Sequence, residues 1–185
     1  MKTVYLIHGW GDNQNSNWFP WIKKELEKKN FKVIIPNMPN TDKPKIEEWV
    51  SHLKKVIKGT NENTYFIGHS LGCQAILRYL EFTNKKVGGA IFVAGWFNLK
   101  NLEDEELLVA KPWIETPINF DKIKKNLKLT VFLSENDPFN CLKENKTMFE
   151  TKLGAKVKII EKAGHFVIGD GANELLIVLN ELLNM

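Results

Sequence analysis

Apolar positions along the chain follow two different periods that alternate from the first residues to the last. Short, nearly continuous apolar runs predict six β-strands, at residues 3–7, 31–35, 64–67, 89–94, 129–133 and 156–160. Apolar residues spaced three or four apart predict helices around 22–26, 46–57, 75–80, 142–153 and 175–183. Strands that alternate with helices favour a parallel sheet covered by helices on both faces, and strands buried on both faces are apolar throughout. The pattern therefore predicts an α/β fold with about six parallel strands.

Residues 95–127 interrupt the alternation of strands and helices. The segment contains tryptophan and phenylalanine residues, two prolines and the acidic cluster 103–106. A stretch of this length between two strands is usually functional or a small extra subdomain. We therefore expect a single domain over residues 1–185, with 95–127 as a reduced cap above the functional site.

Composition and charge indicate whether a nucleic-acid partner is to be expected. The chain has 185 residues, of which 43% are hydrophobic and 26% charged, as in ordinary soluble domains. The net charge is +4, but the lysines are interspersed with acids, as at 23–29, and Arg78 is the only arginine. Because base reading and bidentate phosphate binding favour arginine, we interpret the charge as surface solvation and expect no nucleic-acid partner.

The sequence favours a cytoplasmic protein. No apolar run is long enough to cross a bilayer, and the apolar stretch at 3–7 is too short for a signal peptide. Cys73 and Cys141 fit no metal or disulfide spacing, which is typical of reduced cysteines in a cytosolic protein. We expect no membrane partner. The sequence does not indicate an oligomeric state.

A glycine-flanked serine follows the third predicted strand. Gly68-His69-Ser70-Leu71-Gly72 fits the pattern G-x-S-x-G, in which a tight strand-to-helix turn exposes the serine hydroxyl as a nucleophile. Side chains two residues before and after the serine would collide in that turn, so both positions require glycine. A glycine-rich turn without chemistry is the alternative, but the context of strand before and helix after favours Ser70 as a nucleophile.

A serine hydroxyl needs a base, and the order of residues in the chain points to one histidine. In folds with this turn, the acid and the histidine follow the serine along the chain. His165 is the only histidine after Ser70, and it lies in a loop directly past the sixth predicted strand. We therefore predict His165 as the base.

The acid is expected after the fifth predicted strand, in the run Ser134-Glu135-Asn136-Asp137-Pro138-Phe139. Asp137 is the better candidate, because the following proline fixes the loop and Glu135 lies close to the strand. Its role would be to hold the histidine tautomer and to stabilise the imidazolium. The alternative is that Asp137 only caps a helix over 140–152.

Two backbone N–H groups are required to hold a developing oxyanion. One is expected from Leu71, the residue after the nucleophile. The other is expected from the loop after the first strand, where Trp10 is the first choice and Gly9 the second. A simple turn between strand and helix is the alternative for that loop.

Aromatic residues near these motifs could line an apolar acyl pocket. The candidates are Trp10, Trp96, Phe97, Trp113, Phe139 and Phe166, and core packing is the alternative for each of them. Because the expected cap is short, we predict a preference for short acyl groups over long lipid chains.

A metal site is a weaker interpretation of the histidines. His8, His69 and His165 could converge at one edge of the sheet, but no carboxylate or cysteine stands beside them at a metal-ligand spacing. The chain also lacks the glycine-rich patterns of nucleotide sites. We expect no metal and no cofactor.

The motifs together resemble the small serine hydrolases related to retinoblastoma-binding protein 9 and the bacterial YdeN protein. The matching segments are Ile7-His8-Gly9, Gly68-His69-Ser70-Leu71-Gly72, Val93-Ala94-Gly95, Lys111-Pro112-Trp113, Phe120-Asp121-Lys122-Ile123, Asn136-Asp137-Pro138-Phe139 and Gly164-His165-Phe166. The resemblance covers essentially the whole chain, and it implies a compact α/β-hydrolase with a triad of Ser70, Asp137 and His165. The retinoblastoma-binding tag L-x-C-x-E is not carried over, because Ala75 follows Leu71-Gly72-Cys73-Gln74 where the tag needs glutamate.

The sequence thus predicts a serine hydrolase that cleaves a small ester, thioester or amide through an acyl-enzyme on Ser70. A rival hypothesis is a binding module that keeps the fold with little or no turnover. A third is an enzyme that passes the acyl group to an acceptor other than water.

Overall fold

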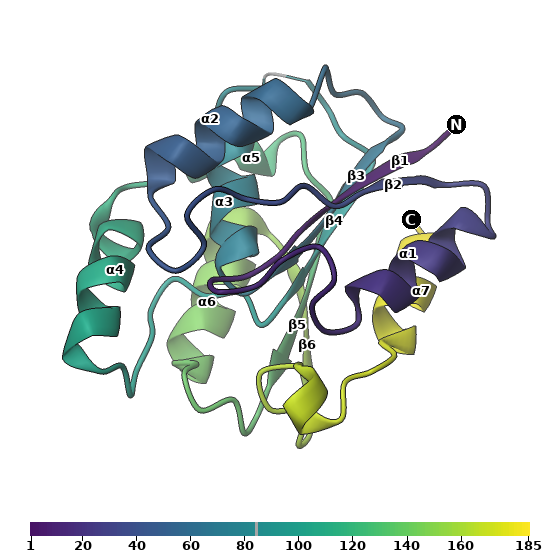
Figure 1. Ribbon diagram of the computed structural model, residues 1–185. Helices are drawn as coiled ribbons and strands as arrows, with labels where there is room; N and C mark the ends of the chain where they lie inside the picture. The colour runs from purple at the N-terminus through teal and green to yellow at the C-terminus, as the bar shows by residue number, and fades with distance from the viewer. Residues whose placement is uncertain (84) are drawn as a thin grey trace.

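In the computed structural model, which describes residues 1–83 and 85–185, the strands form one parallel sheet (Figure 1). The six strands are β1 (Thr3–Ile7), β2 (Lys32–Ile34), β3 (Thr64–His69), β4 (Gly89–Val93), β5 (Leu129–Ser134) and β6 (Lys156–Ile160). Their order across the sheet is β2-β1-β3-β4-β5-β6, and each pair is parallel. The predicted parallel sheet is therefore confirmed.

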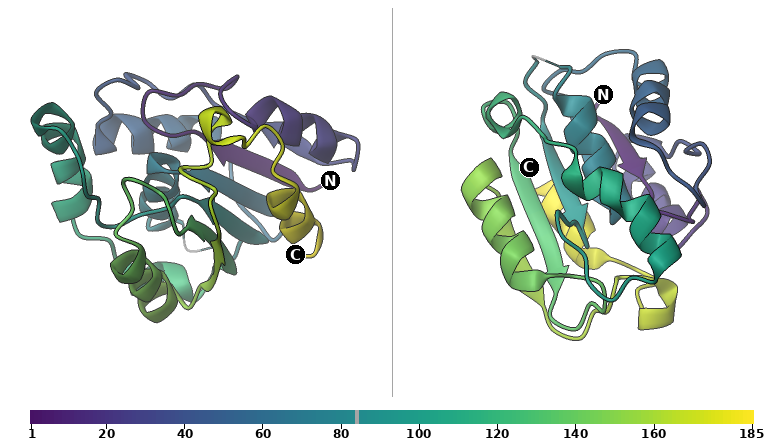
Figure 2. Two further views of the ribbon diagram at one scale, coloured as in Figure 1. Left: turned by 90° about the horizontal axis from the view of Figure 1, so that it is seen from below. Right: turned by 90° about the vertical axis from the view of Figure 1, so that its left-hand side faces the viewer.

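The helices cover both faces of this sheet, as the views from three directions show (Figures 1 and 2). They are α1 (Phe19–Glu27), α2 (Ile46–Val56), α3 (Leu71–Leu80), α4 (Asp104–Glu115), α5 (Phe120–Lys124), α6 (Leu142–Leu153) and α7 (Leu176–Leu183), with a 3-10 turn η1 at Ile168–Asp170. Helices α1 and α7 pack together on one face, whereas α2, α3, α5 and α6 lie on the other. Among the described residues, none of the helices combines the length and apolarity needed to span a bilayer.

Two apolar cores fill the space between the sheet and its helix layers. Trp18 and Phe19, at the start of α1, are completely buried in the core that α7 closes. The larger core lies against α2, α3 and α6 and contains Trp49 and Phe149. Burying each such side chain contributes on the order of 2 kcal/mol to folding, so the sheet is held firmly from both sides.

The boundaries of several elements differ by one or two residues from those predicted. Strand β2 loses one residue at each end of the predicted run, and α7 begins at Leu176 rather than Leu175. Strand β3 continues past Ile67 to His69, so that only Ser70 separates it from α3. This extension matters for function, because it delivers Ser70 to the carboxyl edge of the sheet.

The segment 95–127, predicted as a cap, contains α4 and α5. Helix α4 begins with a capping box, in which Glu103 and Glu106 satisfy each other's backbone N–H groups. The end of the segment packs into the larger core, where Trp113 and Ile123 are buried. Its first part, around 96–106, reaches the carboxyl edge of the sheet, where the candidate site lies.

Candidate active site

Ser70 stands on a strained turn between β3 and α3. Its backbone has φ +50° and ψ −119°, a combination that non-glycine residues rarely adopt and that is held here by surrounding structure. The Ser70 N–H donates to the carbonyl of Val93 at 2.9 Å, and its own carbonyl accepts from Cys73 N–H at 3.0 Å. The turn therefore projects the hydroxyl away from the sheet at the start of a helix.

The two glycines of the elbow are needed for steric reasons. A Cβ at Gly72 would collide with the carbonyl oxygen of Ile7 on the neighbouring strand. A Cβ at Gly68 would lie 2.9 Å from the backbone nitrogen of Cys73, closer than real Cβ atoms approach backbone. Neither obstacle is a flexible side-chain end, so the spacing in the motif follows from close packing of β1, β3 and α3.

Asp137 and His165 form a hydrogen-bonded pair beside the elbow. His165 Nδ1 and Asp137 Oδ2 are 2.8 Å apart, and the Asp137 side chain is almost completely buried. The other carboxylate oxygen of Asp137 accepts the Phe139 N–H at 3.0 Å, which fixes the orientation of the carboxylate. The N-cap of α6 is Cys141, so the alternative of Asp137 as a helix cap is not what the structure shows.

The loops that carry this pair are tied to each other by side chains. Asn136 Oδ1 accepts the Gly164 N–H at 2.9 Å and also the Ser134 hydroxyl, whose oxygen in turn accepts the Ala163 N–H. These bonds join the loop after β5 to the loop after β6. Together with the pairing of β5 and β6, they place Asp137 and His165 relative to each other.

The backbone of His165 is held from two further directions. Its N–H donates to the carboxylate of Asp170 at 2.7 Å, and its carbonyl accepts from His69 Nε2 at 2.9 Å. Gly164 has φ +53°, and a Cβ there would collide with the Asp170 carboxylate, so the turn before His165 requires glycine. The imidazole is left with its Nε2 side available for chemistry.

The predicted oxyanion donors surround the same point. Leu71 is the first residue of α3, where backbone N–H groups have no acceptor within the helix and the helix dipole favours negative charge. A Cβ at Gly9 would lie 3.2 Å from Ser70 Cβ, so the loop after β1 approaches the nucleophile closely. Leu71, Trp10 and Gly11 line one cavity with Ser70, and Gly11 was not predicted.

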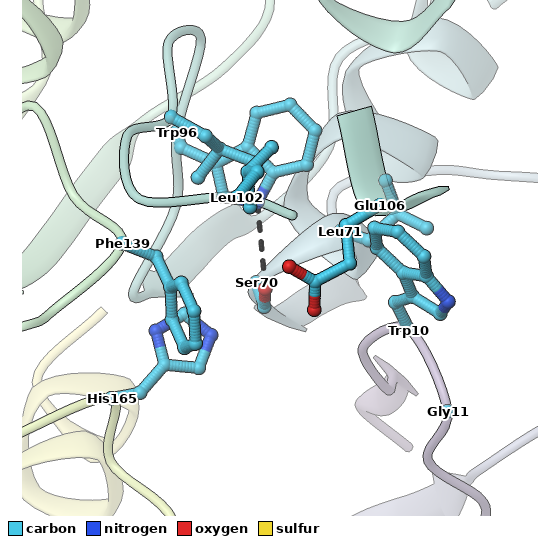
Figure 3. Close-up of a pocket in the computed structure, with 10 residues that line it drawn as sticks. Trp10, Gly11, Ser70, Leu71, Trp96, Leu102, Glu106, Phe139 and His165 are labelled. Carbon is cyan, nitrogen blue, oxygen red and sulfur yellow. Dashed lines mark hydrogen bonds between the residues drawn. The ribbon is translucent and has the colours of Figure 1, made fainter. Parts of the chain in front are cut away.

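A cavity of about 310 Å³ opens above Ser70 (Figure 3). It is lined by Trp10, Gly11, Ser70, Leu71, Trp96, Leu99, Leu102, Glu106, Phe139 and His165. The indole N–H of Trp96 donates to Ser70 Oγ at 3.4 Å, and the Glu106 carboxylate enters from α4. A pocket of this size, mostly apolar with a few polar groups, is typical of small-molecule sites.

Three of the aromatic residues predicted for the pocket do not line this cavity. Phe97 packs against Phe149, with ring centroids 4.6 Å apart, and Trp113 packs against Trp49. Phe166 is buried in the core on the α1 and α7 side. Aromatic side chains serve cores as readily as pockets, and their sequence positions alone do not distinguish the two environments.

His8, the first of the histidines considered for a metal site, has structural partners. His8 is fully buried, and this burial lowers its pKa by disfavouring the charged ring. His8 Nδ1 donates to the Gly9 carbonyl, and Nε2 accepts the Met38 N–H at 3.1 Å. In the described part of the chain, no group of three histidine, cysteine, aspartate or glutamate residues could hold a metal ion.

Sequence reasoning missed several contributors to this site. Glu106 was read only as part of an acidic cluster, although the spacing of Glu103 and Glu106 is that of a capping box and would have placed the helix start. Asp170 lay in no motif, and His69 and Asn136 lay in motifs that assigned them no role, because what they do depends on loops brought together only by the fold.

The parallel sheet agrees with comparison to known proteins, whose solved structures share this fold. The family model described as serine hydrolase matches residues 4–183, and the chain belongs to this family. It is an enzyme of the hydrolase class with an α/β-hydrolase fold.

Among its relatives is the YdeN protein of Bacillus subtilis strain 168, which is 33% identical over 187 residues, or 98% of this chain and 94% of that protein. The crystal structure of the ydeN gene product has a TM-score of 0.91 and covers 100% of this chain and 98% of its own, at 31% identity. Serine hydrolase RBBP9 of Rattus norvegicus is 30% identical over 161 residues, or 86% of this chain and 83% of that protein.

Proposed function

We propose that the enzyme cleaves a small carboxylic ester, thioester or amide through an acyl-enzyme on Ser70. The observation that carries the proposal is the 2.8 Å pair of His165 and buried Asp137, which faces the same cavity as a serine on a strained elbow. A cytoplasmic location is part of the proposal, and it is supported by the two free thiols, Cys73 and Cys141.

The proposed reaction has two halves that use the same groups. In the first, Ser70 Oγ attacks the acyl carbon, its proton passes to His165 Nε2, and that proton then leaves with the alcohol, thiol or amine. In the second, water attacks the acyl-enzyme and gives a proton to His165, the bond between carbon and Oγ breaks, and His165 returns that proton to Oγ as the carboxylic acid leaves. Asp137 holds the His165 tautomer, and the N–H groups of Leu71 and of Trp10 or Gly9 hold the oxyanion.

An active-site-directed fluorophosphonate tests this proposal directly. The purified protein is expected to be labelled covalently, and labelling is expected to be prevented by prior heat denaturation. No labelling of the folded protein would refute the proposal and favour a binding module. Labelled protein that releases acyl groups only to an added alcohol or amine, and never to water, would identify an acyltransferase instead.

The size of the cavity predicts a preference for short acyl groups. About 310 Å³ is at the lower end of the range for ligand pockets, and the bulky side chains of Trp10, Trp96 and Phe139 are part of the lining. We expect kcat/KM for p-nitrophenyl acetate or butyrate to exceed that for the palmitate ester. Highest turnover on the palmitate ester, measured below its critical micelle concentration, would contradict this prediction.

Glu106 is expected to disfavour substrates that carry a negative charge on the acyl group. Its carboxylate lies in the cavity that holds Ser70, so an anionic acyl group would be repelled across a few ångströms. Such repulsion amounts to roughly 1–3 kcal/mol at a partly solvated site, or on the order of tenfold or more in kcat/KM. We expect p-nitrophenyl butyrate to be preferred over p-nitrophenyl hemisuccinate, and Glu106→Gln to reduce that preference.

The matched control is Glu105→Gln, which removes the same charge from an exposed neighbour in the first turn of α4. It is expected to leave the ratio of the two rates close to that of the unmodified enzyme. An equal change in both variants would show that only the overall charge matters, and it would contradict a specific role for Glu106.

A further inference from the structure

We infer that Trp96 is a catalytic residue, whose indole N–H stabilises negative charge on Ser70 Oγ while this oxygen loses or regains its proton. The inference rests on the proposed acyl-enzyme mechanism, and it adds a third donor, directed at Ser70 Oγ, to the two backbone N–H groups of the oxyanion hole. Sequence reasoning assigned Trp96 only to the wall of the pocket.

The geometry places the indole nitrogen directly at the reacting oxygen. Trp96 follows the end of β4 by three residues, and its side chain is almost completely buried. Its Nε1 lies 3.4 Å from Ser70 Oγ and donates to it, as the dashed line in Figure 3 shows. The ring therefore presents a neutral N–H donor, which stays protonated at every pH at which the protein is folded.

Buried amide side chains hold this segment in place. Gln74 Nε2 donates to the Trp96 carbonyl at 2.9 Å from α3, the helix that begins next to Ser70. Asn145, which is completely buried in α6, accepts the N–H groups of Phe97 at 2.7 Å and Asn98 at 2.9 Å with one oxygen. Donors that are fixed before the reaction need no reorganisation during it, which makes them effective in catalysis.

The distance between Trp96 Nε1 and Ser70 Oγ in the resting enzyme leaves the serine hydroxyl free to act. A serine hydroxyl has one donor and two acceptor sites, so an indole N–H bound to one lone pair leaves the O–H free to reach His165. A separation of 3.4 Å is long for an N–H···O bond, so this bond is weak in the resting enzyme. Bonds to a charged oxygen are shorter and about twice as strong.

The bond therefore strengthens as the reaction proceeds. When His165 takes the Ser70 proton, charge develops on Oγ as it forms its bond to the acyl carbon. When the acyl-enzyme is hydrolysed, the bond between carbon and Oγ breaks, Oγ carries the electron pair, and it then regains a proton from His165. Only interactions that are stronger in the transition state than in the ground state accelerate a step, and the Trp96 donor satisfies this condition in both halves.

Trp96→Phe tests the role of the donor, because phenylalanine keeps an aromatic wall and removes the N–H. Stopped-flow measurement with p-nitrophenyl acetate separates the substrate dissociation constant, the acylation rate constant and the deacylation rate constant. We expect both rate constants to fall on the order of tenfold, as for loss of one hydrogen bond that strengthens in the transition state, and the dissociation constant to change little. A residue that only forms the wall would change the dissociation constant instead.

Trp49→Phe is the matched control. It removes the same atoms from an indole whose N–H donates to the Pro39 carbonyl at 2.8 Å, away from the cavity. At a temperature where the variant is folded, it is expected to keep the rate constants of the unmodified enzyme. Equal losses in Trp49→Phe and Trp96→Phe would assign the effect to loosened packing and overturn the inference.

Gln74→Met keeps the indole and removes one of the bonds that place it. We expect an acylation rate constant between those of the unmodified enzyme and Trp96→Phe. Unchanged acylation in folded Trp96→Phe would overturn the inference, and where that variant does not fold, unchanged acylation in Gln74→Met would do so. These outcomes differ from failure of the proposed function, in which the unmodified enzyme itself neither forms an acyl-enzyme nor reacts with fluorophosphonate.

Discussion

Ser70→Ala is expected to abolish fluorophosphonate labelling and to lower ester hydrolysis by roughly 10,000-fold to a million-fold, while the protein stays folded. The loss is large because the serine, histidine and aspartate act as one unit, so removing the nucleophile removes the covalent route entirely. Alanine retains the Cβ and adds no atom in the crowded elbow, so the strained backbone at this position is not made worse.

Ser51→Ala serves as the control for this substitution, because Ser51 is an exposed serine on α2. It is expected to be labelled at the rate of the unmodified enzyme. The readouts are gel fluorescence after labelling, intact mass and the circular dichroism of both variants. Folded Ser70→Ala protein that still becomes labelled would place the nucleophile elsewhere.

Asp137→Asn is expected to lower kcat roughly 10,000-fold without unfolding the protein. The buried carboxylate now accepts from His165 Nδ1 at 2.8 Å, which leaves Nε2 unprotonated and able to take the serine proton. An asparagine amide that donates to Nδ1 would instead place the proton on Nε2, where it faces Ser70 and blocks its role as base. The measurement is kcat for a p-nitrophenyl ester, together with the thermal unfolding midpoint.

Glu135→Gln is the counterpart for Asp137→Asn. Glu135 is exposed, lies two residues earlier in the same loop, and was the other acid considered from the sequence. The same exchange of carboxylate for amide is expected to leave kcat essentially unchanged. A larger loss in Glu135→Gln than in Asp137→Asn would mean that the acid of the site has been assigned wrongly.

Much of the fold was predictable because its causes are local. The period of apolar residues reports whether a segment is a strand or a helix, and the alternation of the two predicts a parallel sheet with covered faces. The order β2-β1-β3-β4-β5-β6 did not follow from the pattern, because any apolar strand can pair with any other. Helices α4 and α5, within the segment read only as a cap, were also not predicted.

The pocket shows where reasoning from the sequence fails. Trp96 and Phe139 line the cavity, as predicted from the sequence. Phe97 and Trp113 instead pack against other aromatic rings in the core. Neighbours in sequence such as Trp96 and Phe97 point in different directions from the same loop. The hydrophobic effect is non-directional. An aromatic residue in the sequence therefore predicts burial, but it does not indicate whether the side chain lies in the core or in a pocket.

The sequence by itself determined the elbow around Ser70 and the order in which the candidate acid and base follow it. This was possible because the glycines two residues before and after the serine form a short pattern that can be read directly in the sequence. Only the tertiary structure decided which groups surround the serine oxygen. The 2.8 Å pair of Asp137 and His165, the carboxylate of Glu106 and the indole N–H of Trp96 come from separate loops and helices. Hydrogen bonds and charge effects act over a few ångströms, and the folded chain alone sets distances between such distant segments.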